Sequence, residues 1–108
     1  MINPDDLKVD QCYFIVGFYD SGFRYPHIRT MFYIGKDVFK KNAGKDKWYF
    51  QDGELYLKRG VPKKESEAEN LGVLALDESA LPLVETLDSL IEMLNDVKED
   101  KLRFKHKV

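Results

Sequence analysis

The chain has few side chains of the types that carry out catalysis, and they are not spaced as catalytic groups. Its two histidines, His27 and His106, stand far apart in the sequence, so only folding could bring them together. The single thiol, Cys12, begins an apolar segment, where we expect a small buried side chain rather than an activated nucleophile. Phosphate-binding, dinucleotide-binding, zinc-protease and nucleophile-elbow motifs are absent from the sequence. The residues therefore favour a protein that is not an enzyme and that uses no cofactor or metal.

One loop still brings chemically useful side chains close together. Arg24, Tyr25 and His27 follow the turn-forming sequence Asp-Ser-Gly at residues 20–22, and Pro26 disfavours a helix there. If the chain is an enzyme with an unrecognised site, these three residues are the first ones to test.

A basic segment is the main candidate for contact with another molecule. Residues 36–64 hold 9 basic and 4 acidic residues, and a run of three aromatic residues lies among them. The candidate interaction surface comprises Lys36, Lys40, Lys41, Lys45, Lys47, Trp48, Lys58 and Arg59. Basic residues with interleaved aromatics can bind single-stranded nucleic acid by stacking. However, residues 65–100 hold 11 acidic residues and 1 basic residue and would repel phosphate, so nucleic acid is the alternative and a protein partner is favoured.

The first half of the chain has the pattern of a sheet. Of 14 aromatic residues, 13 lie between Tyr13 and Tyr56. Residues 11–19 and 28–35 alternate like strands, and their closeness in sequence predicts an antiparallel pair. Gly17 suggests a bend or a close backbone approach in the first of these strands.

Residues 51–60 allow two interpretations. Asp52-Gly53 between two apolar stretches favours a β-hairpin, because a type I′ turn needs positive φ at both central residues. Alternatively, Asp52 caps a short helix of residues 53–59 that ends at Gly60. We favour the hairpin, since Gly53 would weaken a short helix.

The second half of the chain has the pattern of a helix. The short apolar run 71–76 favours a strand, and residues 82–98 carry an apolar stripe that we expect to pack on the sheet. The stripe comprises Leu83, Val84, Leu87, Leu90, Ile91, Leu94 and Val97. The basic tail 101–108 alternates like a strand, so it could extend its own sheet or that of a second copy in a homodimer, or remain a tail.

These patterns predict one α+β domain over residues 1–108. Its parts are a sheet-forming region of about 9–60, a linker of about 61–70, a helix of about 82–98 and the tail. We expect a small bent antiparallel sheet of four to six strands, similar to an SH3-like or half-open barrel in strand spacing alone, packed by one long C-terminal amphipathic helix. With one cysteine, no apolar run of membrane-spanning length and no secretory leader, we expect a cytoplasmic protein. The most favoured function is a non-enzymatic protein–protein interaction module with a polarised charge surface.

Overall fold

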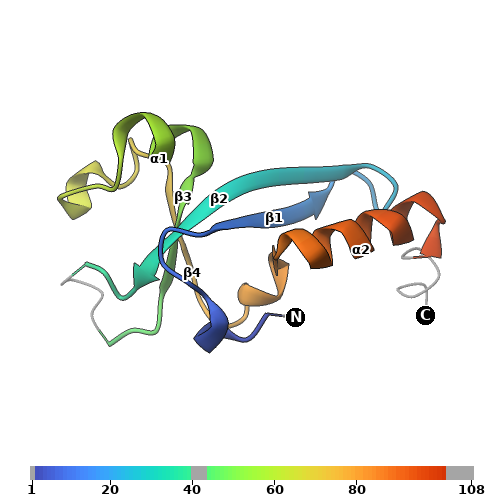
Figure 1. Ribbon diagram of the computed structural model, residues 1–108, viewed down its shortest axis with the longest axis horizontal. Coiled ribbons are helices and arrows are strands. Elements are labelled where there is room, and N and C mark those ends of the chain that lie inside the picture. Colours follow the sequence, from blue (N-terminus) through green and yellow to red (C-terminus); the bar gives the residue numbers. More distant parts are fainter. Residues whose placement is uncertain (1, 40–43, 102–108) are drawn as a thin grey trace.

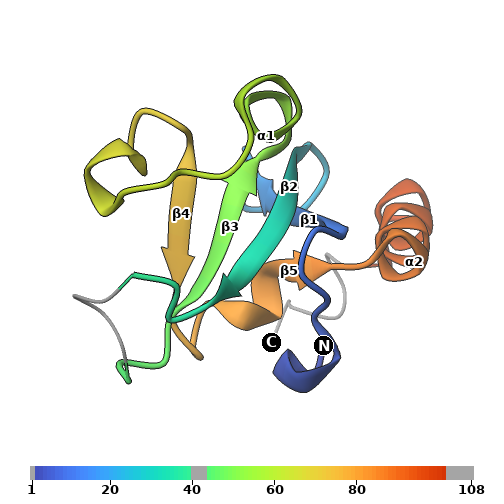
Figure 2. The ribbon, with the colours of Figure 1, turned by 60° about the vertical axis from the view of Figure 1, so that its left-hand side comes forward.

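A five-stranded antiparallel sheet with an open edge on each side organises the molecule, and its strands run in the order β4-β3-β2-β1-β5 (Figures 1 and 2). The computed structural model describes residues 2–39 and 44–101. The strands are β1 Cys12–Phe18, β2 Pro26–Lys36, β3 Trp48–Asp52, β4 Val73–Leu76 and β5 Val84–Glu85. The helices are α1 Gly53–Arg59 and α2 Leu87–Lys98, and three 3₁₀ turns are η1 Pro4–Asp6, η3 Glu65–Glu67 and η4 Leu81–Leu83. The predicted α+β class and antiparallel sheet are confirmed.

The predicted pair of strands forms the centre of the sheet. β1 and β2 are antiparallel, with Tyr13 opposite Met31 and Gly17 opposite His27. β2 has 11 residues, but β3 pairs only with its second half, from Met31 onward. The outer half of the β1–β2 hairpin therefore extends beyond β3.

Most of the core lies on one face of this sheet. It comprises Tyr13, Ile15, Met31, Tyr33, Trp48, Phe50, Leu76, Leu81 and Val84. The N-terminal segment packs against it through Ile2 and Leu7. Asn3 caps η1, since its Oδ1 accepts a hydrogen bond from the Asp5 amide at 3.0 Å. The opposite face is buried in part as well, since Val16, Tyr49 and Gln51 are 5%, 3% and 0% exposed.

The favoured hairpin at Asp52-Gly53 is wrong, and the alternative helix is confirmed. Asp52 is the N-cap of α1, and its Oδ2 accepts a hydrogen bond from the Leu55 amide at 3.1 Å. Gly60 ends the helix with φ +73°. A Cβ at residue 53 would lie 3.0 Å from the Thr30 carbonyl oxygen, so the glycine is explained by close backbone approach rather than by a turn.

The expected long C-terminal helix is shorter than predicted. Residues 81–83 form η4, and Val84–Glu85 forms a strand that pairs with Phe14 and Ile15 of β1. α2 begins after Thr86, which forms a capping box with Ser89. The capping box at Thr86, inside the predicted range 82–98, therefore sets the helix start.

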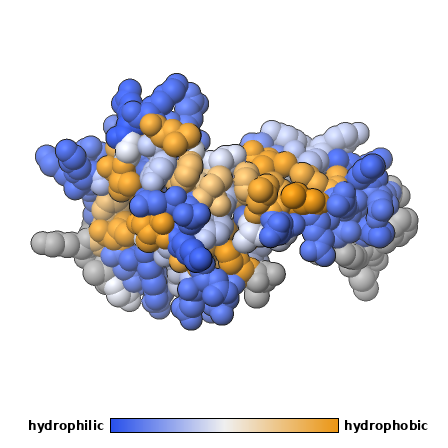
Figure 3. All heavy atoms as spheres, viewed as in Figure 1, coloured by the Kyte–Doolittle hydropathy of each residue, from blue (hydrophilic) through white to orange (hydrophobic). Residues whose placement is uncertain are grey.

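The expected burial of the whole apolar stripe is also wrong. Leu90 is 6% exposed, but Leu87 is 60% and Ile91 is 52% exposed. α2 runs along β1 beside the sheet edge, so it contacts the rest of the fold on one side only (Figures 1 and 2). Hydrophobic surface is visible where α2 passes beside the hairpin (Figure 3).

Within residues 2–39 and 44–101, no helix has the length and apolar character needed to cross a membrane. The strand prediction for the tail concerns residues 102–108, which lie outside the described part of the chain.

Candidate interaction site

The predicted basic surface is partly neutralised by acidic neighbours. Three lysines lie against carboxylates, at 3.0 Å for Lys36–Asp46, 4.0 Å for Lys47–Asp77 and 2.7 Å for Lys58–Glu54. A hydrogen bond to Asp46 raises the pKa of Lys36. Lys45 and Arg59 are exposed, whereas Lys40 and Lys41 lie outside the described residues. The segment is therefore less positive as a surface than its sequence indicates.

The aromatic run of this segment belongs to the core. Trp48 is 7%, Tyr49 is 3% and Phe50 is 0% exposed. Lys36 also covers Trp48, with its Nζ 5.0 Å from the ring centre. Stacking on nucleic-acid bases needs open ring faces, and these three rings do not offer them.

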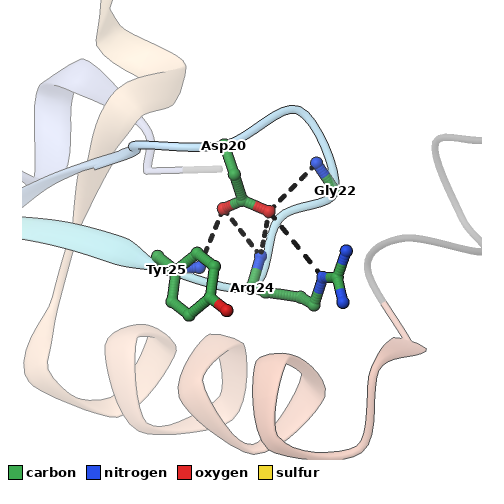
Figure 4. Close-up of polar contacts among 4 residues, drawn as sticks. All are labelled: Asp20, Gly22, Arg24 and Tyr25. Atoms are coloured by element: carbon green, nitrogen blue, oxygen red, sulfur yellow. Dashed lines mark hydrogen bonds and ion pairs between the residues drawn. The ribbon is translucent and has the colours of Figure 1, made fainter.

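The loop that carries Arg24 and Tyr25 is organised by Asp20 (Figure 4). Its Oδ1 accepts hydrogen bonds from the amides of Tyr25 at 2.9 Å and Arg24 at 3.1 Å. Its Oδ2 accepts from the Gly22 amide at 3.1 Å and lies 3.9 Å from the Arg24 Nε. One carboxylate thus fixes the whole turn between β1 and β2, which is typical of aspartate in turns.

The same contacts set the electrostatics of the turn. Partial burial acts to raise the pKa of Asp20, but the amides of Tyr25, Arg24 and Gly22 and the Arg24 guanidinium together lower it below its ordinary value. Asp20 is therefore ionised at neutral pH and holds the loop as a charged acceptor.

The outer half of the hairpin presents an uncovered surface. Tyr19 is 75% and Tyr25 is 61% exposed, and the Tyr19 amide donates to the Tyr25 carbonyl at 3.0 Å. The ring of Tyr19 lies 5.1 Å from that of His27. A Cβ at Gly17, opposite His27, would meet nothing within 4 Å.

We define the hairpin surface as Tyr19, Arg24, Tyr25, His27 and Arg29, all of which are exposed. The structure thus brings together the three loop candidates, while Tyr19 and Arg29 were missed. The signal was present in the sequence, because the predicted antiparallel pairing places these two residues beside the other three.

A contact between two aromatic rings stabilises the turn that carries this surface. Phe18 and Phe23 pack edge to face, with ring centres 5.2 Å apart. Together with Asp20, this contact holds the tip of the hairpin in one shape. The hairpin surface therefore lies on a turn that both polar and aromatic contacts support.

The described residues offer little for catalysis. They contain no group of three or more His, Cys, Asp or Glu residues that could hold a metal ion. Cys12 is exposed, which corrects the expected burial, because it lies on the face of β1 opposite Tyr13 at the strand's first position. Partial desolvation raises the pKa of Cys12, so the thiol is not activated.

Comparisons of the chain with protein-family models, with curated proteins and with solved structures gave no match. The function is therefore inferred from the surface and its chemistry.

Proposed function

We propose that the chain is a non-enzymatic protein–protein interaction module that binds its partner through the hairpin surface. The observation that carries this proposal is the pair Tyr19 and Tyr25, 75% and 61% exposed on a turn fixed by Asp20. Tyrosine and arginine are enriched among the residues that dominate binding energy at interfaces. A tyrosine can bury about 150–250 Å² while losing few rotatable bonds. The hairpin surface has this composition and this rigidity.

The charge of the hairpin surface indicates the character of the partner. Arg24 and Arg29 carry positive charge, whereas Asp20 is engaged in holding the turn. Residues 65–100, with 11 acidic residues and 1 basic residue, give another part of the chain the opposite sign. We expect a partner that presents acidic side chains next to an apolar patch, and association that slows as salt is added.

We also propose the finer fold assignment, a bent SH3-like sheet in half-open form. β2 supports it, because this long strand pairs with β1 along its first part and with β3 along its second. The pairing with β3 shifts between Tyr33 and Gly35, and the latter has φ +132°. β2 thus belongs to both halves of the sheet, and a register shift within such a strand bends the sheet.

Selection of peptide ligands tests the function. A random 12-residue peptide library is selected on the immobilised protein, and affinities of the recovered peptides are measured for wild type and for Tyr19→Ser/Tyr25→Ser. We expect acidic, apolar-containing peptides whose Kd rises at least about tenfold in the double variant. The matched control is Leu57→Ser, which changes a residue that is 74% exposed on α1, away from the hairpin tip in Figure 1.

Two results would contradict the proposal. Peptides that bind the double variant as tightly as wild type would place the site elsewhere. Peptides that lose affinity equally with Leu57→Ser would show a general effect of removing exposed apolar side chains.

A further inference from the structure

We propose that the outer edge of β4 is a second binding site, which takes an extended basic segment of a partner protein by strand addition. This site goes beyond the proposed function and does not depend on the hairpin surface. β4 is the last strand on its side of the sheet (Figure 2). Such an edge carries backbone groups that an extended peptide can pair with.

The register identifies which backbone groups point outward. The Asp52 amide donates to the Gly72 carbonyl at 2.8 Å, and alternation along β4 then directs Leu74 and Leu76 toward β3. Val73 and Ala75 consequently direct their amides and carbonyls away from the sheet. The Val73 amide confirms this direction, because it donates to the Ala68 carbonyl at 2.9 Å outside the sheet.

Ala75 is therefore the centre of the free edge. Its amide and carbonyl point outward, its side chain is exposed, and neither backbone group has a hydrogen-bond partner among the described residues. The Val73 carbonyl points to the same side. An incoming strand would pair with these groups and place its side chains beside those of β4.

The edge lacks several of the features that usually prevent strand addition. Natural edge strands are protected by short length, lysine, proline, bulges or covering loops. β4 consists of Val-Leu-Ala-Leu and pairs with β3 in continuous register, without a bulge. β4 has four residues and the Ala68 carbonyl already accepts from the Val73 amide, so the part of the edge that is open to another chain is the Val73 carbonyl and the two backbone groups of Ala75.

Charge selects the class of partner. Residues 65–78, which contain β4 and its two flanks, hold five acidic residues and no basic residue, and one of the five, Asp77, lies 4.0 Å from Lys47. The preceding turn is tied to β4, since the Gly72 amide donates to the Glu69 carbonyl at 3.2 Å. A second copy of β4 would bring these acidic flanks together, so a two-fold β4 pair is disfavoured. An extended segment that alternates apolar residues with lysine or arginine complements the edge in both backbone and charge.

A matched set of synthetic octapeptides tests the site. The probes are Val-Lys repeated four times, Val-Glu repeated four times, and the Val-Lys peptide with N-methyl groups on alternate residues. N-methylation removes backbone donors but keeps the charge. Binding is measured on the full chain by titration of amide NMR signals. We expect the Val-Lys peptide to bind and to shift the Ala75 signal, and both other peptides to bind at least tenfold more weakly.

Two protein variants separate the edge from general charge effects. Ala75→Lys places a positive charge on the edge and should weaken binding of the Val-Lys peptide at least tenfold. Leu87→Lys adds the same charge on α2, at a residue 60% exposed, and should weaken it much less. Retention of the amide spectrum shows that each variant is folded.

Several outcomes would overturn the inference. These are no binding of the Val-Lys peptide at millimolar concentration, equal binding of the N-methylated peptide, or equal weakening by both lysine variants. Sedimentation of the protein alone adds another, because a dimer that Ala75→Lys converts to monomer would make a second copy the occupant. Weaker peptide binding by the Tyr19→Ser/Tyr25→Ser variant tests the hairpin surface and not the β4 edge. Either proposal can therefore be refuted without refuting the other.

Discussion

Replacement of Gly72 by alanine tests how the chain turns from β3 into α1. Gly72 has φ +71°, and a Cβ there would lie 2.7 Å from the Asp52 Cβ and 3.0 Å from the Leu55 Cδ1. Both contacts belong to the start of α1, so the added methyl group would push against the cap of the helix. Displacement of Asp52 would also strain its amide hydrogen bond to the Gly72 carbonyl, which is 2.8 Å long.

Gly44 supplies the matched control for this substitution. It has φ +77°, and a Cβ there would meet nothing within 4 Å. Alanine at positive φ costs about 1–2 kcal/mol of stability. Overpacking of a close contact adds about 1–3 kcal/mol. We therefore expect a loss of about 2–5 kcal/mol for Gly72→Ala and about 1–2 kcal/mol for Gly44→Ala.

Urea unfolding measures the difference. Trp48 is the only tryptophan and is 7% exposed, so its fluorescence reports the loss of the core. The comparison uses the free energy of unfolding, provided that the urea dependence is the same in all three proteins. Equal losses in the two variants would refute the packing of Gly72 against Asp52 and Leu55, and with it the explanation of the β3–α1 junction.

Three further predictions follow from burial and charge. In urea unfolding, Leu90→Ala should lower the free energy of unfolding by about 2–5 kcal/mol, and Leu87→Ala should lower it by less than about 0.5 kcal/mol. Equal losses in the two variants would mean that α2 packs through another face. Folding lowers the pKa of Asp20, so its carboxylate stabilises the fold when the pH is above the pKa of the unfolded chain, about 3.9. This stabilisation is lost as the pH falls through the lower pKa of the folded state. The stability difference between wild type and Asp20→Asn should accordingly be present at pH 7 and shrink in acid melts, and a constant difference would contradict the assignment. Single-stranded oligonucleotides at low salt should leave Trp48 fluorescence unchanged, and quenching would show that its ring is open to stacking.

The strands of the sheet could be predicted because their signal is local. Alternation along residues 11–19 separates Tyr13 and Ile15 from their neighbours on the opposite face, and β1 occupies that segment. The second strand follows within reach of a short turn, so antiparallel pairing was the simplest connection. Neither step needs information from the rest of the chain.

The junction at Asp52-Gly53 could not be decided in this way. The same dipeptide suits a type I′ turn and the start of a capped helix. The choice depends on the Thr30 carbonyl and on Gly72, which contact this point from other parts of the chain. A tertiary contact thus selects the helix, although the local sequence favours the hairpin.

The apolar stripe of α2 shows a second limit of prediction from the sequence. Spacing of three and four indicates which residues share a face, but not how much of that face a neighbour covers. Leu90 meets the sheet and Leu87 does not, because α2 lies at the sheet edge rather than across its face. The burial of each residue in the stripe therefore depends on where the helix packs against the sheet, which the spacing of the residues does not indicate.

The candidate site was partly accessible from the sequence. Arg24, Tyr25 and His27 were identified by residue type and closeness in the chain. Tyr19 joins them through the register of the hairpin, since its amide bonds to the Tyr25 carbonyl. The role of Asp20 as acceptor for three amides depends on the three-dimensional path of the turn.

The most direct test of the interaction proposal is to map a selected peptide onto the protein by amide NMR. A ¹⁵N-labelled sample is titrated with the tightest peptide from the library, and signal shifts are assigned to residues. The account predicts that the largest shifts fall at Tyr19, Arg24, Tyr25, His27 and Arg29, and that they disappear in Tyr19→Ser/Tyr25→Ser. Largest shifts on α2 or α1, with the hairpin signals unmoved, would contradict it.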